Sequence, residues 1–97
     1  MKTGIELIAI ERQEQIEKHG YTIERDVDSY DFENNDGLYE LPVMAIAAIE
    51  GNDGHAPAGW DLVLVQKICD KEYKDRLIIA GALIAAEIDR IQALENI

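Results

Sequence analysis

Several residue types are scarce in this 97-residue chain, and each scarcity narrows the class of protein to which the chain can belong. Cys69 is the only cysteine, so no intrachain disulfide can form and a reducing, cytoplasmic location is expected. The apolar run over residues 77–86 is about half the length that crosses a bilayer, so no membrane partner is expected. No signal peptide is predicted, because the apolar stretch after Lys2 is short and broken by Glu6.

Basic residues are also scarce. Nine Lys and Arg stand against 20 Asp and Glu, which gives a net charge of -11 and a pI near 4.4. A field of this sign repels phosphate backbones, so direct binding of nucleic acid is not expected. The negative charge fits binding to a protein with a basic surface or to a divalent cation. Solubility alone also explains it. The length predicts a single domain over residues 1–97.

Patterns that carry catalysis are missing from the sequence. Two histidines and one cysteine are too scattered to predict a zinc site. The sequence shows no arrangement typical of a Ser, Cys or Thr nucleophile, no phosphate-binding glycine motif and no basic aromatic patch. We therefore assign no catalytic residue. The acidic stretch DVDSYDFENNDG (26–37) fails as a calcium loop, because Asp31 stands where glycine is required and Gly37 where glutamate is required. A solvated acidic loop is predicted over residues 21–37, with loose cation binding left open.

Helical signals dominate the rest of the chain. Thr3 and Glu6 form a capping box that starts a first helix, which is predicted to end near His19, before Gly20. Its apolar face carries Ile5, Ile8, Ala9, Arg12, Gln15, Ile16 and His19. A second helix is expected over Leu41–Glu50, because Pro42 fits a first turn and Gly51 ends it. Residues 61–69 fit a strand or a short helix, and the short helix is favoured because no partner strand is evident.

The last helix is predicted to run from near Asp70 almost to the terminus, with apolar residues on two sides. One face carries Tyr73, Leu77, Ala80, Gly81, Leu83, Ile84, Glu87, Ile88, Ile91 and Leu94. The other carries Ile78, Ile79, Ala82, Ala86 and Ala93. A helix that is apolar on both sides must be buried on both sides. In so short a chain a second copy covers the second side most economically, so we expect a homo-oligomer built on this helix.

Two opposite charges lie within these apolar faces, Arg12 on the first helix and Glu87 on the last. A charge in a core stripe is costly without a partner, so the two are expected to pair with each other. Two interpretations remain open. The pair is either a structural bridge, or part of a ligand site in which Arg12 holds a phosphate or carboxylate and Glu87 a metal or a base edge. Gln15, His19 and Arg90 lie close enough on their helices to join such a site.

These observations together predict an all-α fold. We expect a small helical bundle in which the long first and last helices pack antiparallel, braced by one or two short helices and wrapped by the acidic loop.

The segments ERQEQIEKHGYT (11–22) and AGALIAAEIDRI (80–91) resemble a family of small helical proteins from bacteriophages and prophages. The sequence pattern of this family emphasises the positions that are occupied in this chain by Arg12, Gln15, Gly20, Asp26, Glu87 and Arg90. Arg25 departs from the family's histidine, Pro42 interrupts the second helix, and Trp60 alone represents a cluster of tryptophans. The family is distantly similar to MazG-type all-α nucleotide pyrophosphohydrolases, whose defining carboxylate motifs are not reproduced in this chain.

The resemblance implies a phage-type accessory protein in the cytoplasm of a host cell. We expect it to act by binding and to counter or adjust a host defence system. Its partner would be a host protein with a basic surface, or a small nucleotide-like ligand held in the oligomer, with no cofactor. The alternative is a magnesium-dependent nucleotide pyrophosphohydrolase with Glu11, Asp26 and Glu87 as ligands and Arg12 on phosphate. A second alternative is a purely structural oligomer.

Overall fold

The computed structural model describes residues 1–19 and 40–95, with the side chains of residues 18 and 19 left aside. This part of the chain is helical and contains no strand: α1 (Gly4–His19), α3 (Glu40–Glu50), the 3-10 helix η1 (Asp53–His55), α4 (Leu62–Cys69) and α5 (Tyr73–Glu95). The predicted all-α class is confirmed. The acidic loop expected over 21–37 lies outside the described residues.

Local hydrogen bonds explain where the helices begin and end. The Thr3 amide donates to Glu6 Oε1 over 3.1 Å and the Glu6 amide donates to Thr3 Oγ1 over 3.2 Å, which is the predicted capping box. Gly51, which follows α3, has a φ of 67°, a conformation that favours glycine. The Asp61 carboxylate accepts from the amides of Val63 and Leu64 and so caps α4. Residues 62–69 are therefore the short helix that the sequence favoured.

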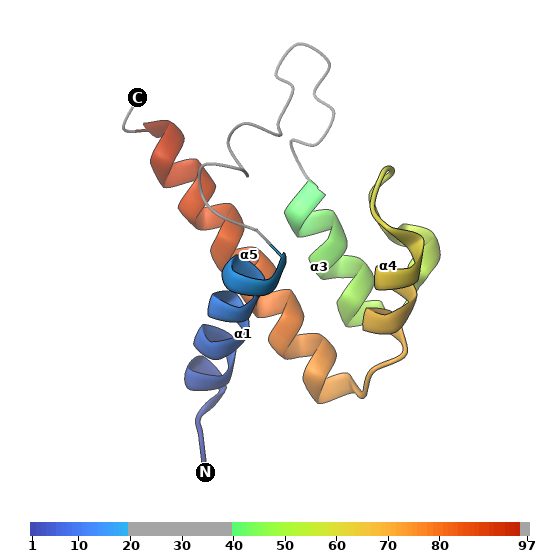
Figure 1. Ribbon diagram of the computed structural model, residues 1–97, viewed down its shortest axis with the longest axis horizontal. Coiled ribbons are helices and arrows are strands. Elements are labelled where there is room, and N and C mark those ends of the chain that lie inside the picture. Colours follow the sequence, from blue (N-terminus) through green and yellow to red (C-terminus); the bar gives the residue numbers. More distant parts are fainter. Residues whose placement is uncertain (20–39, 96–97) are drawn as a thin grey trace.

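The core lies between α3 and α5, which run antiparallel, and α4 closes one side of it (Figure 1). Many of the buried side chains are small, so the two helix backbones approach closely. The core residues are Leu41, Met44, Ala45, Ala47 and Ala48 from α3, Val65 and Ile68 from α4, and Ile79, Ala80, Leu83 and Ala86 from α5.

The first and last helices pack against each other as predicted. A Cβ added at Gly81 of α5 would lie 2.6 Å from Ile8 Cδ1, so the glycine makes room for this side chain of α1. Farther along both helices, Arg12 reaches Asp89. The helices therefore cross while running in the same general sense (Figure 1), and the antiparallel arrangement expected from the sequence belongs to α3 and α5. Short connections favour antiparallel neighbours, and no short connection joins α1 to α5.

The buried side of α5 is the one with the smaller residues. Ile79, Ala82 and Ala86 are buried. Ala80 and Leu83 of the other expected face are buried as well, whereas its remaining large residues Tyr73, Leu77, Ile84, Ile88 and Ile91 lie at the surface. Leu77, Ile84, Ile88 and Ile91 are 39 to 51% exposed, and we call these four residues the α5 stripe. A single chain therefore covers one side of α5 and leaves the α5 stripe on the other side partly exposed.

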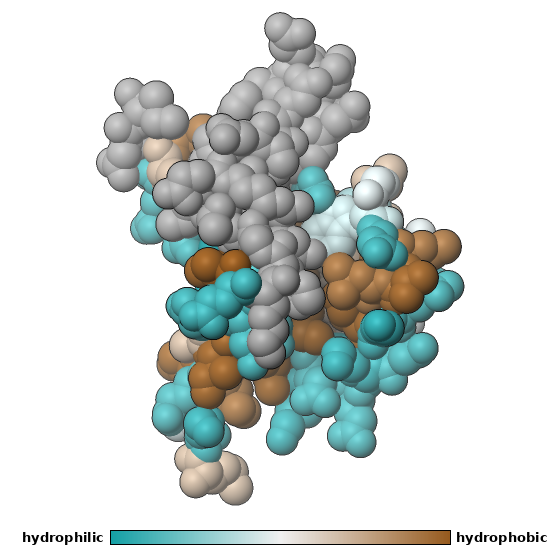
Figure 2. Space-filling view, in the orientation of Figure 1, coloured by the Kyte–Doolittle hydropathy of each residue, from teal (hydrophilic) through white to brown (hydrophobic). Residues whose placement is uncertain are grey.

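Hydrophobic surface is not confined to α5. Ile46 of α3 and Leu62 and Val63 of α4 are each more than half exposed. On the face shown in Figure 2, hydrophobic residues gather over the α3 and α4 side of the molecule, among hydrophilic neighbours. None of the helices in the described part of the chain is long and apolar enough to cross a membrane.

Candidate polar site between α1 and α5

Buried polar side chains lie in the second half of α1 and in the second half of α5. Arg12 is 8% exposed and Gln15 is 3% exposed, and their spacing of three residues puts them on one side of α1. Arg90 of α5 is 5% exposed. These are the buried polar and charged residues of the described chain. The sequence predicted the burial of Arg12 and Gln15 from their places in the apolar face of the first helix. It placed Arg90 in neither apolar face of the last helix and did not predict its burial.

The ion pairs of this cluster differ from the expected one. Arg12 Nη2 lies 3.5 Å from Asp89 Oδ2 and so links the two helices. Glu87 Oε1 instead accepts from Arg90 Nε on its own helix, because residues three apart on a helix are neighbours. Arg12 thus pairs with Asp89 and Glu87 with Arg90, whereas the sequence analysis expected Arg12 to pair with Glu87.

Asp89 is the member of the cluster that sequence reasoning missed. The Asp89 side chain is 39% exposed, whereas the Arg12 side chain is 10% exposed. The signal was its position, eight residues after Gly81, which puts both on the side of α5 that faces α1. That side could be identified only once Gly81 was known to contact Ile8.

Gln15 carries a buried polar atom that the described residues leave without a hydrogen bond. Its Oε1 is buried and has no hydrogen-bond partner within the described chain. Buried carbonyl oxygens nearly always accept a hydrogen bond, and leaving one without a donor costs about 1–3 kcal/mol. The cluster can therefore accept a hydrogen bond from a ligand that brings an N–H or O–H group to Gln15.

The expected metal ligands do not meet among the described residues. Glu11 lines a hollow of ≈ 330 Å³ with Glu14, Lys71 and Asp75, whereas Glu87 lies more than two turns farther along α5. Asp26 lies outside the described residues. No group of three His, Cys, Asp or Glu side chains within the described ranges could hold a metal ion. His19 is the last residue of α1, and its side chain is not described.

The surroundings of Cys69 disfavour the thiolate that a cysteine nucleophile needs. Burial raises the pKa of its thiol above the ordinary value, and nearby Asp53 adds to the effect. The thiol is therefore protonated at neutral pH, and it donates a weak hydrogen bond to the Ala47 carbonyl over 3.9 Å. Its contact with the end of α3 is structural.

Comparison with protein-family models, with curated proteins and with solved structures gives no match to this chain.

Proposed function

We propose that this protein is a phage-type accessory protein that acts by binding, as a homo-oligomer assembled through α5. The α5 stripe is the observation that carries the proposal. Its members follow one another at intervals of seven, four and three residues, which is the spacing of a seam between two helices. Exposed apolar surface of this kind marks interaction sites in soluble proteins.

The side chains that flank the stripe support a second copy as its occupant. On a helical wheel its neighbours are mainly uncharged, among them Ala80, Ala85 and Gln92, and Glu87 is engaged by Arg90. Glu95, in the last turn of α5, is the exposed acidic residue in line with Ile88 and Ile91. A chain of net charge -11 repels its own copies. Self-association is therefore easiest where exposed acidic groups are fewest, and the stripe is such a place.

The remaining acidic surface is proposed to engage a protein partner with a basic surface. Such contacts speed association and are weakened by salt, because exposed charges are screened over about 10 Å at 0.1 M ionic strength. The predicted origin in a phage suggests a host protein as that partner. This step rests on the charge and on the sequence motifs alone.

The oligomer is tested by placing a charge in the stripe. Ile88→Lys is expected to weaken self-association by about 2 kcal/mol or more, about thirtyfold in Kd, because a half-exposed isoleucine loses its burial in both copies. Light scattering coupled to size-exclusion chromatography measures the mass across a range of micromolar concentrations. Val63→Lys, on the apolar surface of α4, is the matched control and should leave the mass unchanged. A monomeric wild type, or dissociation by Val63→Lys alone, would overturn the proposal.

A second candidate function is the holding of a small nucleotide-like ligand, with an N–H or O–H group donating to the buried Gln15 Oε1 and its anionic part near the guanidinium of Arg12. The experiment is a thermal-shift titration with ATP, ADP and cyclic AMP, with and without magnesium. Ligand at a hundred times its Kd should add about 2.7 kcal/mol, or roughly 10 °C or more in Tm. Gln15→Leu should keep its stability, since it removes an unsatisfied group, yet lose the ligand response. Gln13→Leu, at an exposed position of α1, is the control.

The same titration separates binding from turnover when phosphate and pyrophosphate release are measured alongside it. Release that requires magnesium and disappears in Glu87→Gln would replace the binding proposal with the hydrolase alternative. A ligand-induced shift without release would support sequestration. If no nucleotide raises the Tm, the ligand candidate is rejected and protein binding remains.

A further inference from the structure

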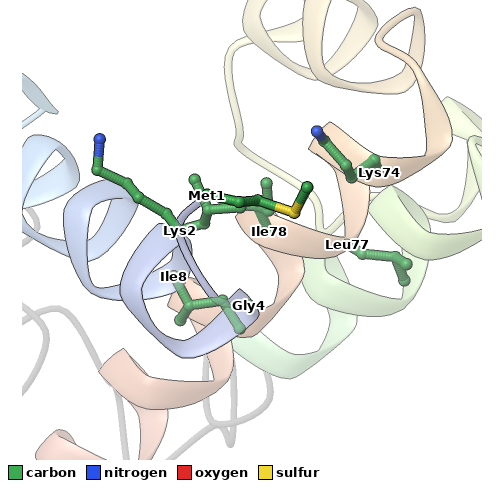
Figure 3. Close-up of a pocket in the computed structure, with 8 residues that line it drawn as sticks. Met1, Lys2, Gly4, Ile8, Lys74, Leu77 and Ile78 are labelled. Carbon is green, nitrogen blue, oxygen red and sulfur yellow. The ribbon is translucent and has the colours of Figure 1, made fainter.

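A second surface hollow lies at the end of the molecule where α1 and α5 both begin. Its volume is ≈ 590 Å³, within the range of about 300–1,000 Å³ that is usual for small-molecule sites. Leu7 and Ile8 of α1 and Leu77 and Ile78 of α5 form apolar walls, and Met1, Lys2, Gly4 and Lys74 complete the lining. Figure 3 shows Lys2 and Lys74 on opposite sides of the hollow, with Met1 and Ile78 between them.

The charge of this hollow is opposite to that of the whole molecule. The chain has nine basic residues against 20 acidic ones, yet two lysines and no acidic residue line the hollow. Because α1 and α5 run in the same general sense, their N-terminal ends lie at the same end of the molecule. Glu6 and Asp75 in their first turns offset the partial positive charge of the helix ends, so the positive charge of the lining comes from the two lysines. The hollow therefore favours an anion at its rim and an apolar group against its walls.

The lining also restricts the apolar part of such a ligand. It offers no aromatic ring on which a base could stack, and no hydroxyl or amide side chain to read one. Leucine, isoleucine and methionine side chains suit a flexible aliphatic chain instead. We propose that this hollow binds a free aliphatic chain with an anionic head group, the head between Lys2 and Lys74 and the chain along the walls formed by α1 and α5.

Calorimetric titration of the full chain with sodium dodecanoate, below its micelle concentration, tests this inference. We expect saturable binding of one dodecanoate per chain. Decanoate should bind up to about fifteenfold more weakly, because each buried CH₂ contributes about 0.8 kcal/mol. Dodecyltrimethylammonium has the same tail and the opposite charge, and it should bind at least about tenfold more weakly. Equal binding of the two amphiphiles would overturn the inference.

Charge reversal identifies the site. Lys2→Glu and Lys74→Glu should each weaken dodecanoate binding by about tenfold at low salt. Lys67→Glu, on the exposed side of α4, makes the same change in net charge and should have no effect. All three lysines are exposed, so the variants should fold, and unchanged Tm values would confirm it. An equal loss in Lys67→Glu would show that only net charge matters and would refute the site.

Two further measurements distinguish this ligand from other occupants. Sedimentation with vesicles of phosphatidylglycerol reveals a membrane as the source of the anion, and binding to vesicles without binding to free dodecanoate would overturn the inference. Ile88→Lys should bind dodecanoate as the wild type does, because Ile88 is not part of the hollow. Leu77 belongs both to the α5 stripe and to the hollow, so the titration is made on the wild type and on Ile88→Lys, and equal binding by the two would separate this inference from the proposed self-association.

Discussion

At the residue scale, one guanidinium joins the ends of three helices. Arg76, near the start of α5, donates through Nη1 to the carbonyls of Ala48 and Ile49 at the end of α3, over 3.2 and 3.0 Å. Its Nε donates to the Lys71 carbonyl just after α4 over 3.0 Å. The last carbonyls of a helix lack partners within it, and a cation is favoured there. A Cβ at Gly51 would lie 2.5 Å from Nη1, so glycine also leaves room for this contact.

Arg76→Met is therefore expected to destabilise the protein by about 2–3 kcal/mol, which lowers the Tm by roughly 10 °C or more. The methionine keeps most of the apolar stem but donates no hydrogen bond. Arg76→Lys should give an intermediate loss, because lysine keeps the charge without the planar set of donors. Thermal unfolding followed by circular dichroism measures both variants. A loss no larger than that of the exposed control Lys67→Met would show that these bonds contribute nothing.

At the scale of the helices, the sequence predicted boundaries better than contacts. Thr3, Gly51 and Asp61 act on the backbone within a few residues, so their effects follow from the local sequence. Which side of α5 is buried does not follow locally, since both sides are apolar. The alanines of α3 decide it, because Ala45 and Ala48 allow close approach only to the side of α5 with small residues.

The polar site shows the same limit. The burial of Arg12 and Gln15 followed from the pattern of the first helix taken alone. The partner of Arg12 depends on the direction in which α1 crosses α5, and the sequence does not encode this direction locally. The sequence analysis paired Arg12 with Glu87 because both charges lie within apolar faces, whereas the observed crossing brings Asp89 to Arg12. The hollow between Lys2 and Lys74 depends on the same crossing, and neither lysine was marked by any motif.

At the scale of the whole molecule, net charge is the dominant electrostatic property. With a charge of -11 on 97 residues, acidic groups repel one another more in the folded chain than in the expanded unfolded chain. The Arg12–Asp89 and Arg90–Glu87 pairs are more buried than the His55–Glu50 pair, so salt screens them less. Added salt should therefore weaken the repulsion among acidic groups more than the attraction within the ion pairs. We expect it to stabilise the folded chain.

We expect the Tm to rise by roughly 5 °C between about 0.01 and 0.2 M sodium chloride, since the Debye length falls from about 30 Å to below 10 Å. Differential scanning calorimetry at constant pH measures the change, and sucrose at equal osmolality controls for exclusion of the solute. Magnesium chloride at equal ionic strength should act like sodium chloride if the effect is screening alone. A distinctly larger rise with magnesium would indicate bound cation and strengthen the hydrolase alternative. A fall in Tm with sodium chloride would instead mean that attraction within the ion pairs outweighs the repulsion among the acidic groups.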